Sequence, residues 1–186
     1  MKKIVLFGDS LFNGFRNRRN TNLITKGLEN RLSNAQVENF SKSGATTVEA
    51  LDYIDQIPQD ADAILIEYGT NDSSAWGISC TNYAKNLETM IAYFNTKKVI
   101  VVGPWHPNPN SDQSNFFNPE TLKTNIQTAK NLAIKYHCPF IDLTKLTNNQ
   151  KDMDKIYQND GLHLTDLGNN LLLDALTPII ESKIRD

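Results

Sequence analysis

Cysteine is scarce in this sequence, long hydrophobic runs are missing, and neither sign of charge is in excess. The 186 residues include only Cys80 and Cys138, too few for the disulfide framework of a small secreted domain, so we expect two reduced thiols. No stretch approaches the roughly 20 apolar residues that span a membrane. Lysine and arginine total 19 against 21 aspartate and glutamate, a formal net charge of −2, and this balance argues against a nucleic-acid-binding protein.

The amino-terminal segment lacks the apolar stretch of a secretory signal. Lys2 and Lys3 precede an apolar run at residues 4–7, but Gly8 and Asp9 end that run. An export signal needs about 7 to 15 apolar residues. Histidine is also scarce, with three scattered residues and no spacing typical of metal ligands. We therefore expect a cytoplasmic protein that needs no metal or other cofactor.

The sequence does contain an alternation of short apolar runs and longer segments of helical periodicity. Hydrophobic residues make up 39% of the chain, enough to bury a full core. Continuous Val, Ile and Leu runs predict strands buried on both faces of a parallel sheet, at residues 4–7, 37–40, 63–68, 99–102 and 139–143. Helices are predicted at about 21–33, 46–57, 81–95, 118–136 and 165–184. We expect an α/β fold in which residues 1–186 form a single domain.

Candidate functional residues follow the predicted strands. Ser10 comes directly after the first strand and Asn71 after the third, so both should lie at the carboxyl edge of the sheet, where open α/β folds bind ligands. A serine there can be a nucleophile, and an asparagine amide can donate to a developing oxyanion. Each also has a purely structural interpretation, as a capping or turn residue. Asp9 and Asp72, beside them, are expected to brace the loops by accepting backbone N–H groups.

A carboxylate and an imidazole lie close together just before the last predicted helix. Asp160 precedes His163 by three residues, with Gly161 between them, so the carboxylate can fold back to accept a hydrogen bond from the ring. The other ring nitrogen is then left as a base. Gly44 follows the second strand, where its N–H can face an anion, although a plain turn glycine fits equally well. Together these signals supply a nucleophile, a base, its orienting carboxylate and hydrogen-bond donors at one edge.

These segments resemble the motifs of the GDSL, or SGNH, family of serine hydrolases. Gly8–Leu11 has the sequence Gly-Asp-Ser-Leu, the motif that names the family, and Gly44 is similar to the glycine of the second block. Gly69–Asp72 matches the third block and Asp160–His163 the last, in the family order. The resemblance implies a three-layer α/β/α, flavodoxin-like fold with five parallel strands and a site at their carboxyl edge.

Carried over by position, the resemblance implies that Ser10 is the nucleophile, His163 the general base and Asp160 its orienter. It also implies an oxyanion hole made by the backbone N–H groups of Ser10 and Gly44 and the side-chain amide of Asn71. The expected activity is hydrolysis of small or short-chain carboxylic esters through an acyl intermediate on the serine, with lysophospholipase or thioesterase side activity. The expected partner is a small-molecule ester.

Three other functions stay open. The first is a carbohydrate O-acetylesterase, because Tyr68, Trp76 and Trp105 can stack on a sugar face, although they can equally be core or pocket-wall residues. The second is a non-catalytic flavodoxin-like module that binds a nucleotide or flavin, but neither G-x-G-x-x-G nor G-x-x-x-x-G-K-[ST] follows the first strand. The third is a phosphohydrolase with Asp9 as nucleophile, which would require an acidic metal-binding cluster that the sequence does not offer. The sequence does not indicate the oligomeric state.

Two loops at the same edge are long. The segment 11–21 carries three arginines, Arg16, Arg18 and Arg19. They can steer an anionic substrate or simply form a solvated loop. The segment Pro104–Pro119 is rich in Pro and Asn and carries aromatic residues that can cover an acyl chain or pin the loop to the body of the protein. The sequence decides neither role.

Overall fold

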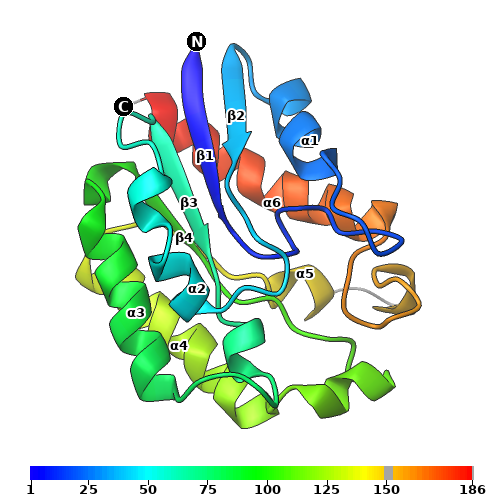
Figure 1. Cartoon of the computed structure of the whole chain (residues 1–186). Helices are drawn as coiled ribbons and strands as arrows, with labels where there is room; N and C mark the ends of the chain where they lie inside the picture. Colours follow the sequence, from blue (N-terminus) through cyan, green and yellow to red (C-terminus); the bar gives the residue numbers. More distant parts are fainter. Residues whose placement is uncertain (149–152, 186) are drawn as a thin grey trace.

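The computed structural model describes residues 1–148 and 153–185 and is built on one parallel sheet. The strands are β1 (Lys2–Gly8), β2 (Ala35–Asn39), β3 (Ala63–Glu67), β4 (Val99–Val102) and β5 (Phe140–Ile141). Their order is β2-β1-β3-β4-β5, and every neighbouring pair is parallel. All strands therefore end at the same edge (Figure 1). In this flavodoxin-like order, ligands bind where the order reverses, between β1 and β3.

The sheet is buried on both faces, as the continuous apolar runs predict. Along β1, Ile4 and Leu6 belong to one hydrophobic cluster, whereas Val5 and Phe7 belong to another. Successive side chains of a strand point to opposite faces, so the two clusters form two separate cores. A strand of this kind cannot have a polar face, and this explains why its sequence does not alternate between apolar and polar residues.

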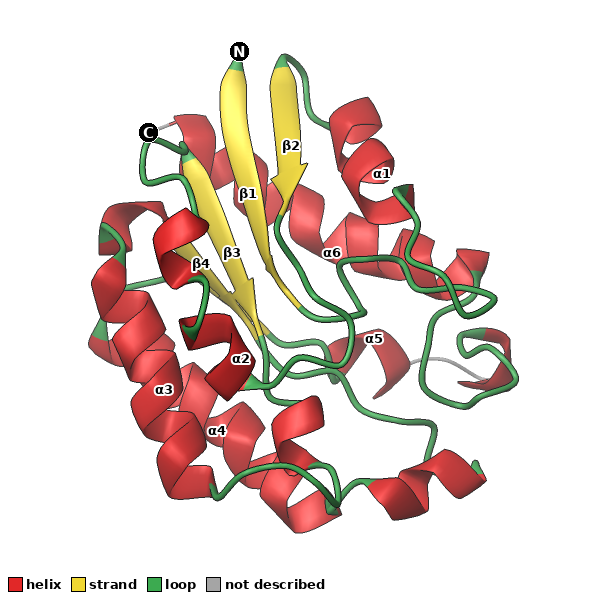
Figure 2. Cartoon of the chain, viewed as in Figure 1, coloured by secondary structure: helices red, strands yellow, loops and turns green. Residues whose placement is uncertain are grey.

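Helices cover both faces and complete three layers. The helices are α1 (Leu23–Arg31), α2 (Thr47–Leu51), α3 (Cys80–Tyr93), α4 (Pro119–Lys135), α5 (Lys145–Asn148) and α6 (Asp166–Arg185). Ile24 of α1 and Leu172 of α6 pack in the first cluster, while Leu87 of α3 and Ala129 of α4 pack in the second. Figure 2 shows α1 and α6 on one side of the sheet and α2, α3 and α4 on the other. The three-layer α/β/α fold is confirmed.

The observed elements differ from the predicted ones mainly at their ends. The predicted helix at 46–57 is wrong in length, because α2 ends at Leu51 and a 3₁₀ turn at Ile54–Gln56 follows. Pro58 then requires an extended residue before it, and Ile57 is extended. The last strand is also shorter than predicted, since β5 lies at the edge and pairs only with β4. The single-turn α5 was not predicted.

Two of the predicted helix starts, at residues 118 and 165, are confirmed by hydrogen bonds. The Asn118 side chain accepts from the N–H of Thr121, and Pro119 occupies the first turn of α4. Thr165 accepts from the N–H of Gly168 at the start of α6. This second cap fixes where the helix begins, directly after the segment that carries the candidate histidine.

Candidate active site

Ser10 and His163 come from opposite ends of the chain and meet at the carboxyl edge of the sheet. The Ser10 Oγ lies 3.2 Å from His163 Nε2. On the other side of the ring, His163 Nδ1 lies 2.8 Å from Asp160 Oδ2. The hydroxyl, the imidazole and the carboxylate thus form a continuous chain of hydrogen bonds, the geometry of a nucleophile, its base and an orienting acid.

The turn that carries Asp160 and His163 is held by the same carboxylate. Asp160 Oδ1 accepts the backbone N–H groups of Leu162 and His163 at 3.0 and 2.9 Å, while Oδ2 faces the ring. Partial burial by itself would raise the pKa of Asp160, but these two N–H groups and the imidazole outweigh it and hold the pKa below its ordinary value. The carboxylate therefore stays ionised and fixes the orientation of the ring.

Glycine is required inside this turn. Gly161 has a φ of +69°, in the left-handed region. A Cβ atom at this position would lie 2.2 Å from Ser111 Oγ in the loop after β4. The Asp-Gly-x-His spacing in the sequence thus reflects both the backbone conformation and the close packing of a neighbouring loop.

The predicted oxyanion-hole residues lie together, but Asn71 is not free. Its Nδ2 donates to Asp9 Oδ2 at 2.9 Å and to the Ala45 carbonyl at 3.1 Å, so both amide hydrogens already have acceptors. No described residue accepts a hydrogen bond from the backbone N–H of Ser10 or of Gly44. Gly44 has a φ of +81°, and apart from its two chain neighbours no residue has an atom within 4 Å of the place a Cβ would take, so this turn is open to a ligand.

Three buried carboxyl groups lie beneath the site. Asp9 accepts the N–H of Leu11 at 2.9 Å, and Asp72 accepts the N–H and hydroxyl of Thr47, so the bracing roles predicted for these aspartates are confirmed. Burial raises the pKa of Asp9 to about 6, although the Leu11 N–H opposes the shift. The third carboxyl belongs to Glu67, and its Oε2 lies 3.4 Å from the backbone N of Asp9.

Sequence reasoning missed Glu67. It ends β3, is fully buried, and its Oε1 has no hydrogen-bond partner among the described residues. Burial, together with the neighbouring charge of Asp9, raises the pKa of Glu67 well above its ordinary value. The sequence signal that could have revealed it is a lone carboxyl at the end of an otherwise apolar strand. In the folded protein this carboxyl lies beside Asp9 of the first motif.

A small cavity opens at the Ser10 hydroxyl. Its volume is about 20 Å³, and its lining includes Ser10, Phe15, Trp105, His163 and Asn169. About 10–15 Å³ suffices for one water molecule, so the cavity accepts a group of roughly that size. A much larger hollow, about 1390 Å³, lies between the loop after β4 and the outer face of α4.

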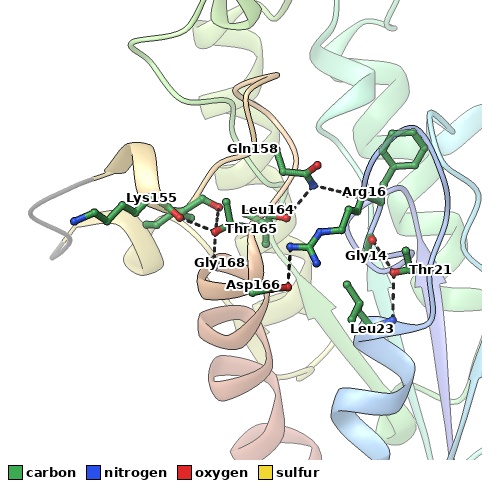
Figure 3. Close-up of polar contacts among 12 residues, drawn as sticks. Gly14, Arg16, Thr21, Leu23, Lys155, Gln158, Leu164, Thr165, Asp166 and Gly168 are labelled. Carbon is green, nitrogen blue, oxygen red and sulfur yellow. Dashed lines mark hydrogen bonds and ion pairs between the residues drawn. The ribbon is translucent and has the colours of Figure 1, made fainter.

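The loop that follows Ser10 is joined to the loop that carries His163. Figure 3 shows Gln158 and Arg16 bridging the two: Gln158 Nε2 donates to the Phe15 carbonyl at 2.7 Å, and Arg16 pairs with Asp166 at 2.8 Å. The Phe15 ring also packs on the His163 imidazole, with ring centroids 4.5 Å apart. Of the three arginines in this loop, Arg16 is therefore partly structural.

Of the aromatic residues considered for sugar stacking, two are core residues. Tyr68 is buried and its hydroxyl lies 2.8 Å from that of Tyr53, so the stacking role considered for Tyr68 is wrong. Trp105 is also buried, stacked on His106. Trp76, in contrast, is 84% exposed and packs edge-on against Phe116. An aromatic side chain belongs in the core when its polar group finds a partner there, and the sequence does not show that partner.

A family model described as GDSL-like lipase/acylhydrolase matches residues 6–171. The chain belongs to this family. The GDSL-like acylhydrolase is therefore a carboxylic ester hydrolase, and the interpretation as a non-catalytic nucleotide-binding module is set aside. A comparison with curated proteins found no match.

Solved structures agree with this assignment. The lipase/acylhydrolase from Enterococcus faecalis is 28% identical, with a TM-score of 0.86, over 100% of this chain and 97% of that one. An acetyl xylan esterase is 20% identical, with a TM-score of 0.78, over 96% and 99% of the two chains. An acetylxylan esterase from Geobacillus stearothermophilus is 18% identical, with a TM-score of 0.75, over 96% and 94%. The last two share the fold of this acylhydrolase.

Two further properties concern metals and membranes. Within residues 1–148 and 153–185 of this acylhydrolase, no group of three or more His, Cys, Asp or Glu side chains is placed to hold a metal ion. In the same part of the chain, no helix is long and apolar enough to cross a membrane.

Proposed function

We propose that this protein hydrolyses small or short-chain carboxylic esters through an acyl intermediate on Ser10. The observation that carries the proposal is the chain from Ser10 Oγ to His163 Nε2 at 3.2 Å and from His163 Nδ1 to Asp160 at 2.8 Å. His163 takes the proton of Ser10 as the hydroxyl attacks the ester carbonyl, then returns it to the departing alcohol. A water molecule repeats the sequence on the acyl-enzyme and regenerates the serine.

The negative charge that develops on the carbonyl oxygen needs donors. The backbone N–H groups of Ser10 and Gly44 are proposed as two of them, since no described residue accepts their hydrogens. Asn71 is proposed as the third. Its amide is held more weakly by the neutral Ala45 carbonyl than by the Asp9 carboxylate, so the bond to Ala45 gives way when an oxyanion forms.

The size of the cavity favours a short acyl group. About 20 Å³ beside Ser10 accepts roughly the methyl group of an acetyl ester, and a longer chain requires the walls to move. Activity on lysophospholipids or thioesters is therefore proposed only as side activity. A cytoplasmic location is also part of the proposal and is supported by two free cysteines, Cys80 and the buried Cys138.

One observation favours carbohydrate O-acetyl esters as the physiological substrates. Trp76 lies five residues after Asn71 at the same edge of the sheet, and its 84% exposure leaves the indole face free for a sugar ring. The loop that carries it is fixed to the loop after β4, because the Ala75 N–H donates to the Phe116 carbonyl at 2.9 Å. Two structural neighbours are acetylxylan esterases, which is consistent with this substrate class.

The nucleophile is tested by Ser10→Ala. The variant is expected to lose at least about 10⁴-fold of its kcat on p-nitrophenyl acetate, because the only proposed nucleophile is removed. Its thermal unfolding should match that of the wild type, because a single oxygen at the edge of the site is removed. Turnover close to wild type in this variant would show that the acyl group is carried elsewhere.

A further inference from the structure

We propose that Gln158 is a positioning residue that sets the distance between the Ser10 hydroxyl and the His163 imidazole. The proposal rests on the proposed function, because it concerns the geometry of that same pair. Gln158 touches neither reacting atom. Its role is to join two loops that are otherwise far apart in the sequence.

The side chain of Gln158 uses both of its N–H donors. Nε2 donates to the Phe15 carbonyl at 2.7 Å, in the loop after β1, and to the Leu164 carbonyl at 2.9 Å, next to His163. Figure 3 shows the amide between the two loops. Carbonyl oxygens only accept hydrogen bonds, so a side chain that spans two of them must carry two donors.

The backbone of Gln158 holds the histidine turn as well. Its N–H donates to the His163 carbonyl at 2.7 Å, and its own carbonyl accepts the N–H of Gly161 at 2.9 Å. One residue therefore contacts the turn that carries His163 at three points. Any shift of Gln158 relative to the loop after β1 moves the imidazole with it.

The connection continues to the nucleophile. The Phe15 N–H donates to the Ser10 carbonyl at 3.2 Å, while the Phe15 carbonyl accepts from Gln158. The Phe15 ring lies against the His163 ring on the same side. Ser10, Phe15, Gln158 and His163 thus form a closed ring of contacts, and the catalytic hydrogen bond is one side of it.

Other contacts of the histidine turn do not hold it firmly against the loop after β1. Trp105 Nε1 donates to the Leu162 carbonyl and the Asn108 N–H to the Gly161 carbonyl, and both tie the turn to the loop after β4. The Arg16–Asp166 pair does reach the loop after β1, but the Asp166 side chain is 74% exposed. Exposed ion pairs contribute little to fixing a geometry. Gln158 is therefore the main polar link between the loops of the base and the nucleophile.

The test replaces the amide without changing its length. Gln158→Met keeps the unbranched side chain and removes both donors, whereas Gln127→Met is the control. Gln127 lies exposed on α4 and its Nε2 also makes one side-chain hydrogen bond, to Asn131 at 2.8 Å. Kinetics on p-nitrophenyl acetate, the pH profile of kcat/KM and thermal unfolding are measured for both variants and for the wild type.

We expect Gln158→Met to lower kcat about 10- to 100-fold with KM changed less than about threefold, since a misplacement of about 1 Å between reacting groups has effects of this size. The pH profile of kcat/KM should change as well, because the imidazole loses its fixed distance to the serine. Gln127→Met should behave as wild type. A folded Gln158→Met with wild-type kcat and pH profile overturns the proposal, and so does a change confined to KM.

A second variant covers the case in which Gln158→Met does not fold. Gln158→Glu has the same shape but presents oxygen atoms to two carbonyls at neutral pH, so its kcat should fall at least as far. Wild-type kcat in Gln158→Glu also contradicts the proposal. Ser10→Ala separates this failure from failure of the proposed function. Full activity in Ser10→Ala contradicts the assignment of the nucleophile. An inactive Ser10→Ala together with wild-type kcat in Gln158→Met contradicts only the positioning role.

Discussion

Asp9 links the core of the sheet to the candidate oxyanion hole. One of its carboxylate oxygens accepts the Leu11 N–H and the other accepts the amide of Asn71, and beneath it lies the buried Glu67. The bond to Asn71 aims one amide hydrogen, leaving the other near Ala45 and Gly44. A residue that touches no substrate in this arrangement still determines where a donor points.

The raised pKa of Asp9 predicts a pH dependence of stability. The pKa is about 6 in the folded protein against an ordinary 3.8, so between these values the folded state binds a proton that the unfolded state has lost. The stability contributed by this group is fully present at low pH and is lost as the pH rises through about 6. From pH 8 to pH 5 the wild type should gain about 1 kcal/mol relative to Asp9→Asn.

Chemical denaturation of the two proteins at pH 5, 6, 7 and 8 measures this difference. The charge of Asp9 also raises the pKa of Glu67, so Asp9→Asn removes part of the Glu67 contribution as well, and both effects act in the same direction. A free-energy difference that stays constant over this range would mean that Asp9 is ionised throughout.

At the scale of elements, the turn before α6 carries more constraint than the helices beside it. Asp160 holds its backbone, Gly161 provides the left-handed conformation, and Thr165 then caps α6. The sequence therefore places the base on a short, rigid connection whose far end is fixed by a long helix. The loop after β1 reaches the first residue of this helix through the Arg16–Asp166 pair, and the helix that follows the loop, α1, begins at Leu23.

Gly161→Ala is expected to destabilise the protein by roughly 1–3 kcal/mol, because a left-handed alanine and a close contact with Ser111 are both unfavourable. Thermal unfolding and kcat on p-nitrophenyl acetate measure the effect, and both should fall. Adding Ser111→Gly removes the contact, together with the hydrogen bond from the Ser111 hydroxyl to the Asn108 carbonyl, so the double variant should recover only part of the loss. Wild-type stability in the single variant would mean that the turn can adopt another conformation at no cost.

For the whole molecule, the layered fold decides what size of substrate reaches the serine. The loops after β1, β3 and β4 and the histidine turn close around Ser10 and leave about 20 Å³. The large hollow along α4 shares the loop after β4 with this cavity, and its other lining residues include Pro119 and Asn131 of α4. Access to Ser10 is set by packing among these four segments rather than by any single motif.

A panel of p-nitrophenyl esters tests this restriction. We expect kcat/KM to fall more than about 10-fold from acetate to octanoate, since one added methylene in a tight pocket changes binding by about 1–3 kcal/mol. Acetylated xylooligosaccharides extend the panel, and Trp76→Ala should reduce their hydrolysis while leaving that of p-nitrophenyl acetate unchanged. Rates that rise with chain length contradict the short-acyl proposal, and equal effects of Trp76→Ala on both substrates contradict the stacking role.

Much of this protein could be predicted from local sequence. The apolar run at residues 99–102 coincides with β4, and caps such as Asn118 and Thr165 mark helix starts, because strand burial and capping depend on neighbouring residues. The motifs also identified the residues that gather at the carboxyl edge, since parallel strands must end there together. The family follows from the same motifs.

Tertiary structure alone decided the rest. The sequence does not reveal that both amide hydrogens of Asn71 have acceptors, that Glu67 lies beneath Asp9, or that Gln158 reaches Phe15. Each of these contacts joins residues far apart in the chain, and their partners are fixed by how three layers pack rather than by any periodicity. Short sequence motifs therefore identify which residues can take part in the chemistry. The distances between these residues and their protonation depend on burial and on neighbours that only the complete fold supplies.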